Sequence, residues 1–239
     1  MNNYPSNPWL NLATDTNRKN FILKEEQSII DKFNSRVSND YKIHDYIFPA
    51  PFMGDVHAAP VIILMLNPGY DKKEDITGTN YYQTYTNWWM QQIQHQLPYP
   101  KLPLFCLEEE YRKKSEYWYN KLKPLINVTS DAKVAYKIAK VQFFPYHSLK
   151  FKALYKTLLK ESGFNSYLPS QEYNFALVRK AIKRNAEIII PRSKKFWYEA
   201  IPELEKYPNK HLTKNYRNPI LSENNLGTQS FKKILDKIS

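Results

Sequence analysis

The sequence has a single cysteine, Cys106, among its 239 residues. One thiol forms no intramolecular disulfide and cannot supply a multi-cysteine zinc site. The five histidines, at positions 44, 57, 95, 147 and 211, have no spacing typical of metal ligands. We therefore expect no metal and no other cofactor.

Long hydrophobic runs are also missing. No stretch is long and apolar enough to cross a membrane, and residues 1–8 lack the charged and apolar regions of a signal peptide. Together with the single cysteine, this predicts a cytoplasmic protein without a membrane partner. The chain also has no Gly-rich phosphate loop, no GxSxG elbow and no HExxH motif, which argues against the best-marked nucleotide, hydrolase and zinc sites.

Positive charge is concentrated in the second half of the chain. Residues 1–128 carry 14 Lys/Arg and 14 Asp/Glu, whereas residues 129–239 carry 21 and 9, which accounts for the whole net charge of +12. A one-sided basic half is typical of proteins that bind a polyanion such as nucleic acid. The alternative is that the lysines only cover the solvent-exposed faces of helices. The charge alone does not decide between this interpretation and nucleic-acid binding.

Short apolar runs alternate with helical patterns. The runs 61–66, 138–144 and 186–190 are each followed or ended by a proline-containing turn, which is typical of buried strands. Helical spacing is expected over residues 23–37, 80–96, 111–123, 130–137, 149–159, 169–184, 194–204 and 229–238. This alternation predicts a three-layer α/β/α fold with a mostly parallel central sheet. We expect residues 1–20 to form an irregular tail and residues 21–239 a single domain.

Three polar turns follow this framework in order. The first strand runs into Asn67-Pro68-Gly69-Tyr70, and the second into Gln142-Phe143-Phe144-Pro145-Tyr146-His147-Ser148. A late loop, Asn218-Pro219-Ile220-Leu221-Ser222, precedes the terminal helix. Ligands of open α/β sheets bind just beyond the carboxyl ends of central strands, so these turns are expected to converge on one site.

The order of these motifs resembles the uracil-DNA glycosylase superfamily. The first motif of this chain, Asn67-Pro68-Gly69, is most similar to the first motif of the mismatch-specific and single-strand-selective branches. In that family the first motif closes strand one, a middle strand carries a base-reading residue, and a late loop precedes the last helix. The resemblance implies a uracil-DNA glycosylase-like fold that flips and excises uracil or another modified pyrimidine from DNA, and we expect a monomer.

The resemblance implies catalytic roles for Asn67, Asn218 and His147. Asn67 would orient the attacking water through its carbonyl oxygen, because an amide accepts no proton near neutral pH and cannot be a general base. Asn218, Arg217 or His147 would donate a hydrogen bond to the departing base. His147 could do so as a neutral or a cationic ring near pH 7.

Binding residues are expected beside the same motifs. The predicted substrate-binding residues are Pro68, Gly69, Tyr70, Gln142, Phe143, Tyr146 and Arg217. Tyr70 and then Phe143 are the preferred platforms for stacking a flipped base, with core packing as the alternative for any one aromatic residue. The predicted DNA-binding residues are Arg192, Lys194, Lys195, Lys214, Ile220 and Leu221. The two aliphatic side chains would fill the space that the base leaves, unless they pack into the core.

The sequence departs from the family pattern at three points. The late loop is one residue shorter and has Ile220 after its proline, and Gln142 stands where many members have asparagine. The first motif has no aspartate at the water-activating position. Two alternatives therefore stay open: a degenerate member that binds DNA or a protein partner without cleaving, and a phage-defence glycosylase for hypermodified bases.

Overall fold

A five-stranded sheet, mostly parallel, forms the centre of the chain. The computed structural model describes residues 4–12, 20–70, 80–96, 102–113, 116–217 and 219–239. The strands are β1 (Phe52–Met53), β2 (Val61–Met65), β3 (Ile138–Gln142), β4 (Glu187–Ile190) and β5 (Lys210–Leu212). They lie in the order β1-β3-β2-β4-β5, with β1 antiparallel to β3 and the other pairs parallel. The expected α/β class and mostly parallel sheet are confirmed.

Ten α-helices are found in the described chain. They are α1 (Gln27–Asn34), α2 (Asn80–Ile93), α3 (Glu109–Arg112), α4 (Tyr117–Val128), α5 (Asp131–Lys137), α6 (Lys156–Glu161), α7 (Pro169–Lys183), α8 (Lys194–Ala200), α9 (Glu223–Leu226) and α10 (Thr228–Ile238). The helix expected over 149–159 is wrong in its first half. There the amide of Lys150 donates to the carbonyl of Asp40, and helical structure begins at Lys156.

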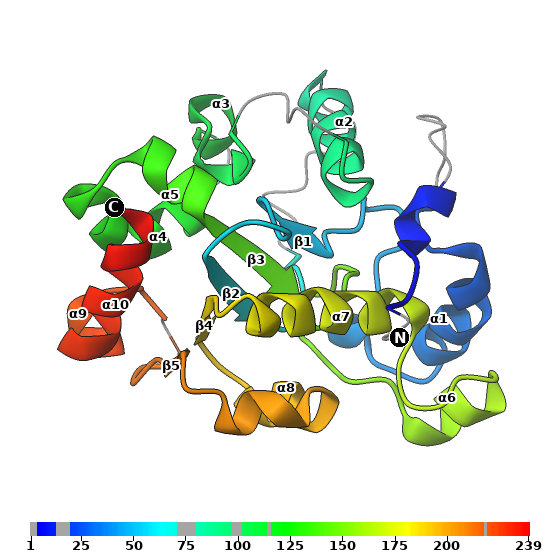
Figure 1. Cartoon of the computed structure of the whole chain (residues 1–239). Coiled ribbons are helices and arrows are strands. Elements are labelled where there is room, and N and C mark those ends of the chain that lie inside the picture. Colours follow the sequence, from blue (N-terminus) through cyan, green and yellow to red (C-terminus); the bar gives the residue numbers. More distant parts are fainter. Residues whose placement is uncertain (1–3, 13–19, 71–79, 97–101, 114–115, 218) are drawn as a thin grey trace.

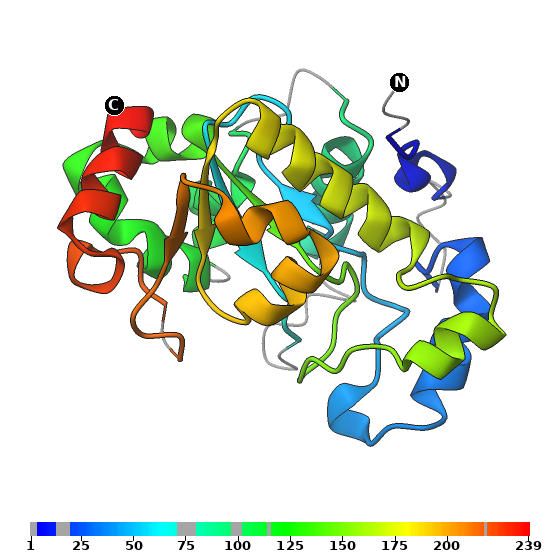
Figure 2. The same ribbon diagram turned by 60° about the horizontal axis from the view of Figure 1, so that its bottom comes forward.

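Both faces of the sheet are buried, which explains the unbroken apolar run of β2. Ile62 and Leu64 face a core shared with α7 and α8, whereas Val61, Ile63 and Met65 face a second core shared with α4, α5 and α10. Figure 1 shows α4, α5, α9 and α10 gathered beside one face of the sheet, and Figure 2 shows α7 and α8 in front of the other. No helix in the described ranges is long and apolar enough to cross a membrane.

The N-terminal segment packs onto this body. Residues Pro8–Asn11 form a short 3-10 helix, and Trp9 is completely buried in the core beside α7. The side-chain amide of Asn7 donates to the carbonyl of Ile93 at 2.7 Å, which ties the segment to the end of α2. Trp9 is therefore the residue that anchors this segment in the core.

A buried carboxyl group joins three distant segments. Glu26 Oε2 accepts hydrogen bonds from the Tyr146 hydroxyl at 2.6 Å and the Ser170 hydroxyl at 2.9 Å, and Oε1 accepts from the Ser170 amide at 2.8 Å. Burial raises the pKa of Glu26 to about 7, although these hydrogen bonds act in the opposite direction. Folding therefore favours the protonated carboxyl group.

This group should make stability fall as pH rises. The pKa of Glu26 is about 7 in the folded chain against an ordinary 4.5, so its contribution is complete below pH 4.5 and is lost by about pH 7. Glu26→Gln mimics the protonated form and should remove up to roughly 3 kcal/mol of that pH dependence. Urea unfolding of both proteins at pH 5 and pH 7.5 checks this, and equal slopes with pH would contradict it.

Candidate functional site

A cavity of about 640 Å³ opens where β2, β3 and β4 end. Parallel strands bring their carboxyl ends to the same edge of a sheet, so the segments that follow them meet here. The strand-end residues that line it are Met65, Leu66, Asn67, Pro68, Gly69, Tyr70, Lys140, Gln142, His147, Arg192 and Ser193. Aromatic residues of three helices also line it, namely Trp89 of α2, Tyr111 of α3, and Tyr117 and Trp118 of α4. The other described lining residues are Ala50, Leu149, Lys150 and Phe151.

The pairing of β2 with β3 continues past both strands and fixes two loops of the cavity together. The amides of Phe143 and Phe144 donate to the carbonyls of Met65 and Leu66 at 2.8 and 2.7 Å. Further on, Gly69 and Ser148 form an isolated parallel bridge. The first and second predicted motifs therefore lie side by side at the mouth of the cavity.

Asn67 is held in one orientation by this arrangement. Its Nδ2 donates to the carbonyl of Pro68 and to the hydroxyl oxygen of Ser148, each at 3.0 Å. The Ser148 hydroxyl in turn donates to the carbonyl of Lys150 at 3.1 Å, so it can only accept from Asn67. These acceptors fix which end of the amide faces Ser148. Within the described chain, no hydrogen bond reaches the Oδ1 of Asn67, which stays available to a ligand or water.

His147 lies beside Asn67 but its ring is already engaged. Its Nδ1 lies 2.9 Å from the carbonyl oxygen of Gly69, and a carbonyl can only accept, so Nδ1 carries a proton. Burial lowers the pKa of His147 to about 4. The ring is therefore neutral at pH 7, with its one proton committed to Gly69. This geometry gives His147 a positioning role for the first motif and leaves no proton on Nε2 for a departing base.

Gln142 lines the cavity and has an unpaired side-chain oxygen. The residue is buried, and its backbone carbonyl accepts a hydrogen bond from Asn174 Nδ2 at 2.8 Å. Its side-chain Oε1 is buried without a hydrogen-bond partner in the described structure. Buried polar atoms are nearly always paired, so an unpaired amide oxygen in a cavity wall indicates a place for a hydrogen-bond donor of a ligand.

Lys140 is the lining residue that the sequence interpretation missed. It lies in β3, level with Ile63 of β2, and is 5% exposed. Its Nζ lies 4.3 Å from the ring centre of Trp118 and 5.9 Å from that of Trp89. Burial lowers the pKa of Lys140 to about 8. The signal was a lysine inside the apolar run 138–144, flanked by Ala139 and Val141.

The charged side chains among the described lining residues of the cavity are all positive. Lys140, Lys150 and Arg192 line it, and no Asp or Glu is among the described lining residues. Lys150 is neutralised by Asp40, with a 2.6 Å contact between Nζ and Oδ2. Arg192 follows β4, is half-buried, and its Nε is buried without a hydrogen-bond partner in the described ranges. Two cations therefore face the cavity without a described carboxylate beside them.

Tyr70 lines the cavity as part of an aromatic group. Its ring lies against that of His44, with centroids 4.0 Å apart, and its hydroxyl accepts a hydrogen bond from Tyr46 at 3.2 Å. Pro68 and Gly69 form the adjoining wall. Tyr70 is thus braced on one side and borders the cavity on the other.

Two predicted binding residues lie in the core instead of the cavity wall. Phe143 is 3% exposed and packs among the rings of Phe151, Tyr167, Phe175, Phe196 and Trp197. Tyr146 is 1% exposed, and its hydroxyl donates to Glu26. Both residues therefore match the alternative expectation, in which an aromatic residue at the strand end packs in the core.

The late loop lies apart from the cavity wall as far as it is described. Asn218 falls outside the described residues. Arg217 and Lys214 are exposed, Ile220 is half-buried, and none of them lines the cavity. Leu221 is 1% exposed in the core beside α10, which is the packing alternative and not the position of a wedge.

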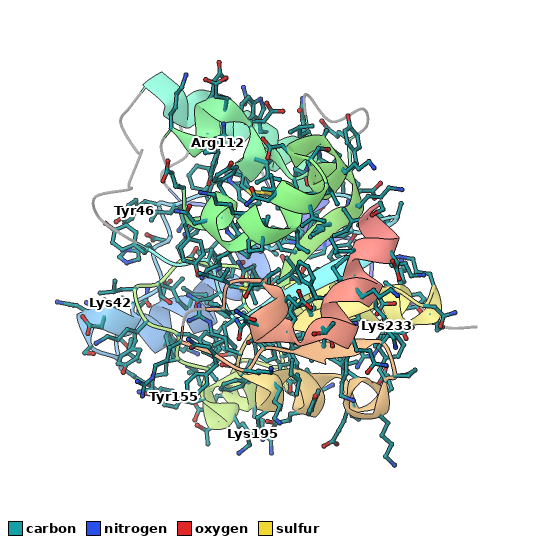
Figure 3. All side chains as sticks on the ribbon, turned by 90° about the vertical axis from the view of Figure 1, so that its left-hand side faces the viewer. Lys42, Tyr46, Arg112, Tyr155, Lys195 and Lys233 are labelled. Atoms are coloured by element: carbon teal, nitrogen blue, oxygen red, sulfur yellow. The ribbon has the colours of Figure 1, made fainter. Side chains whose placement is uncertain are left out.

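Lys194 and Lys195 lie at the start of α8, where they border a shallow groove with Lys156. Figure 3 places Lys195 at the bottom of the molecule, Arg112 at the top and Tyr46 at the left-hand side. Of the predicted DNA-binding residues, only Arg192 is found in the described cavity wall. Lys194, Lys195 and Lys214 lie on the surface, Ile220 is half-buried, and Leu221 lies in the core.

The chain was compared with protein-family models, curated proteins and solved structures. No protein-family model, no curated protein and no solved structure gives a significant match to this chain. The residues and the geometry of the cavity therefore carry the functional argument.

The buried charge of Lys140 should cost stability. At pH 7 an ammonium with a pKa of about 8 is still mostly protonated, and a desolvated charge without a counter-ion is unfavourable. Lys140→Met keeps the length and removes the charge, so it should raise the free energy of unfolding by roughly 1 to 4 kcal/mol. Chemical unfolding at pH 7 measures this. Lys152→Met, at an exposed lysine over two tyrosine rings outside the cavity, is the control, and a less stable Lys140→Met would contradict the prediction.

Proposed function

We propose that this chain is a monofunctional DNA glycosylase with a uracil-DNA glycosylase-like fold, which excises uracil or another modified pyrimidine. The observation that carries the proposal is the oriented amide of Asn67. Ser148 accepts a hydrogen bond from Asn67 Nδ2, and Asn67 Oδ1 is left available at a cavity that is also lined by Gln142, whose side-chain oxygen is unpaired in the described structure. The two residues come from the motifs on which the family resemblance rests.

The cavity can accept a base only after the base has left the duplex. Flipping a nucleotide out of the stack costs about a few kcal/mol, and contacts in the pocket must repay it. The Gln142 amide can donate to and accept from the polar edge of a pyrimidine. Tyr70 borders the same cavity and offers a ring face for stacking, a contact worth about 1–3 kcal/mol per base in single-stranded binders.

Hydrolysis would then proceed through a sugar cation. The bond between C1′ and the base nitrogen breaks with its electron pair leaving on the base, and water attacks the oxocarbenium-like sugar. Asn67 Oδ1 would accept a hydrogen bond from that water and hold it in line. Water positioning suits a cavity with no Asp or Glu among its described lining residues, since the sugar cation needs little base catalysis once the base has begun to leave.

A second candidate is a protein of the same fold that binds DNA without cleaving it. The absence of a carboxylate from the described cavity wall favours this alternative, because no general base is then at hand for a slow leaving group. The uneven positive charge, 21 Lys/Arg against 9 Asp/Glu in residues 129–239, supports DNA as the partner in either case. A cavity suited to hypermodified bases would serve a phage-defence glycosylase equally well.

The proposal is tested by base excision. Duplex and single-stranded oligonucleotides carrying uracil, mismatched thymine or phage-type modified cytosines are incubated with the protein, and abasic sites are revealed by alkaline strand cleavage. We expect excision on at least one substrate, and a rate lower by about 10²- to 10³-fold for Asn67→Ala, as for the loss of other preorganised groups. Ser148→Ala should lose less, because it loosens the amide without removing it.

DNA binding separates the two candidates. Tight binding that weakens steeply with salt, together with no abasic sites above the Asn67→Ala background, favours the non-cleaving protein. Excision that is unchanged in Asn67→Ala contradicts the assigned role of Asn67. An absence of both cleavage and low-salt DNA binding contradicts both candidates.

A further inference from the structure

Lys140 is placed where a lysine serves no structural purpose. Its neighbours on the strand, Ala139 and Val141, belong to the core, and the side chain is buried between indole rings. Among the described residues Nζ forms no ion pair with a carboxylate, and the titratable group that acts on its charge is the buried thiol of Cys106. A cation over an indole face gains about 0.5–2 kcal/mol, which is less than the cost of desolvating an ammonium group. An apolar residue would fit this core better.

The cavity supplies the reason for keeping the charge. Lys140 lines it together with Gln142, two residues further along the same face of β3. The ammonium has three donors and no acceptor, so a group that binds to it must accept hydrogen bonds. Since the described cavity wall has no carboxylate, the negative partner is expected from the ligand.

We propose that Lys140 is the cationic site of this cavity for a negatively charged base. The inference rests on the proposed function in taking the ligand to be a nucleobase. The negative charge has two possible sources, an acidic substituent on a modified pyrimidine or the charge that any pyrimidine acquires as its bond to the sugar breaks. Both put an anionic oxygen or nitrogen atom against Nζ.

The same bonds break and form with either source of negative charge. The electron pair of the C1′–N bond leaves with the base, the water oxygen bonds to C1′, and the water gives up one proton to solvent. Lys140 stabilises the base anion by charge and hydrogen bonding until the anion takes up a proton. Donors directed at developing charge in a water-poor site are among the strongest contributions to catalysis. Lys140 would therefore be a catalytic residue, with Gln142 recognising the neutral edge of the base.

The first experiment is independent of cleavage. Binding of free 5-carboxyuracil and free uracil at pH 7 is measured by calorimetry for the wild type, Lys140→Met, Lys140→Arg and the control Lys152→Met. We expect the wild type and Lys152→Met to bind the carboxylated base at least tenfold more tightly than uracil. Lys140→Met should lose this preference, and Lys140→Arg should keep part of it.

The second experiment measures single-turnover excision of uracil and 5-fluorouracil from the best oligonucleotide substrate. Fluorine stabilises the departing anion and so reduces the need for a cation. Lys140→Met should lose about 10²-fold or more on uracil and distinctly less on 5-fluorouracil. A merely structural role for Lys140 would lower both rates equally. Thermal unfolding of each variant confirms that it is folded.

The outcomes separate the two proposals and the two sources of charge. A carboxylate preference that depends on Lys140 supports a permanent anion, and a leaving-group effect that depends on Lys140 supports the departing base. If the wild type excises nothing, the proposed glycosylase function fails, while the binding experiment still decides for or against Lys140. If Lys140→Met keeps the wild-type binding preference and shows no selective loss on uracil, the inference is overturned.

Discussion

The parallel pairing of β2 with β3, continued beyond the strands, is the constraint on which the site depends. Main-chain hydrogen bonds from Phe143 and Phe144 to the β2 end, and the Gly69–Ser148 bridge, hold two loops in one register. A slip of one residue would turn every side chain of a strand to its opposite face. In that case neither Asn67 nor Gln142 would face the cavity, so the site is fixed by backbone geometry before any side chain contributes.

Two buried ionisable groups show how the chain separates stability from function. Glu26 accepts hydrogen bonds from three donor groups, and it thereby joins the segment before α1 to α7 and to the turn after β3. Lys140 is surrounded by aromatic faces, and no described carboxylate neutralises it. Local sites that work against the fold's own stability are where binding and catalysis are expected.

Much of the framework could be predicted from the sequence because burial on both faces leaves an unmistakable pattern. The apolar run of β2 and the prolines after β3 and β4 set the strands, and the parallel arrangement then brought Asn67, Gln142 and His147 together. Side-chain direction at the strand ends was not encoded in the same way. Phe143 and Tyr146 could have faced either the cavity or the core, and tertiary packing placed them in the core.

Lys140 was overlooked for a related reason. A lysine in a strand is ordinarily read as a solvent-facing position, and only the presence of covering helices on both faces makes this one buried. The helix predicted over residues 149–159 begins only at Lys156 for a similar reason. The amide of Lys150 donates to the carbonyl of Asp40, a residue far away in the sequence. The spacing of apolar residues along the sequence does not reveal such long-range partners.

The proposed glycosylase function requires that this cavity receive a base flipped out of DNA. The most direct test is a crystal structure with an oligonucleotide that contains 2′-fluoro-arabinouridine, whose glycosidic bond resists cleavage. We expect the uracil ring inside the cavity, with its polar edge on Gln142, an oxygen atom near Lys140 Nζ, and a water on Asn67 Oδ1. A uracil that stays stacked in the DNA while the protein contacts only the backbone would contradict it.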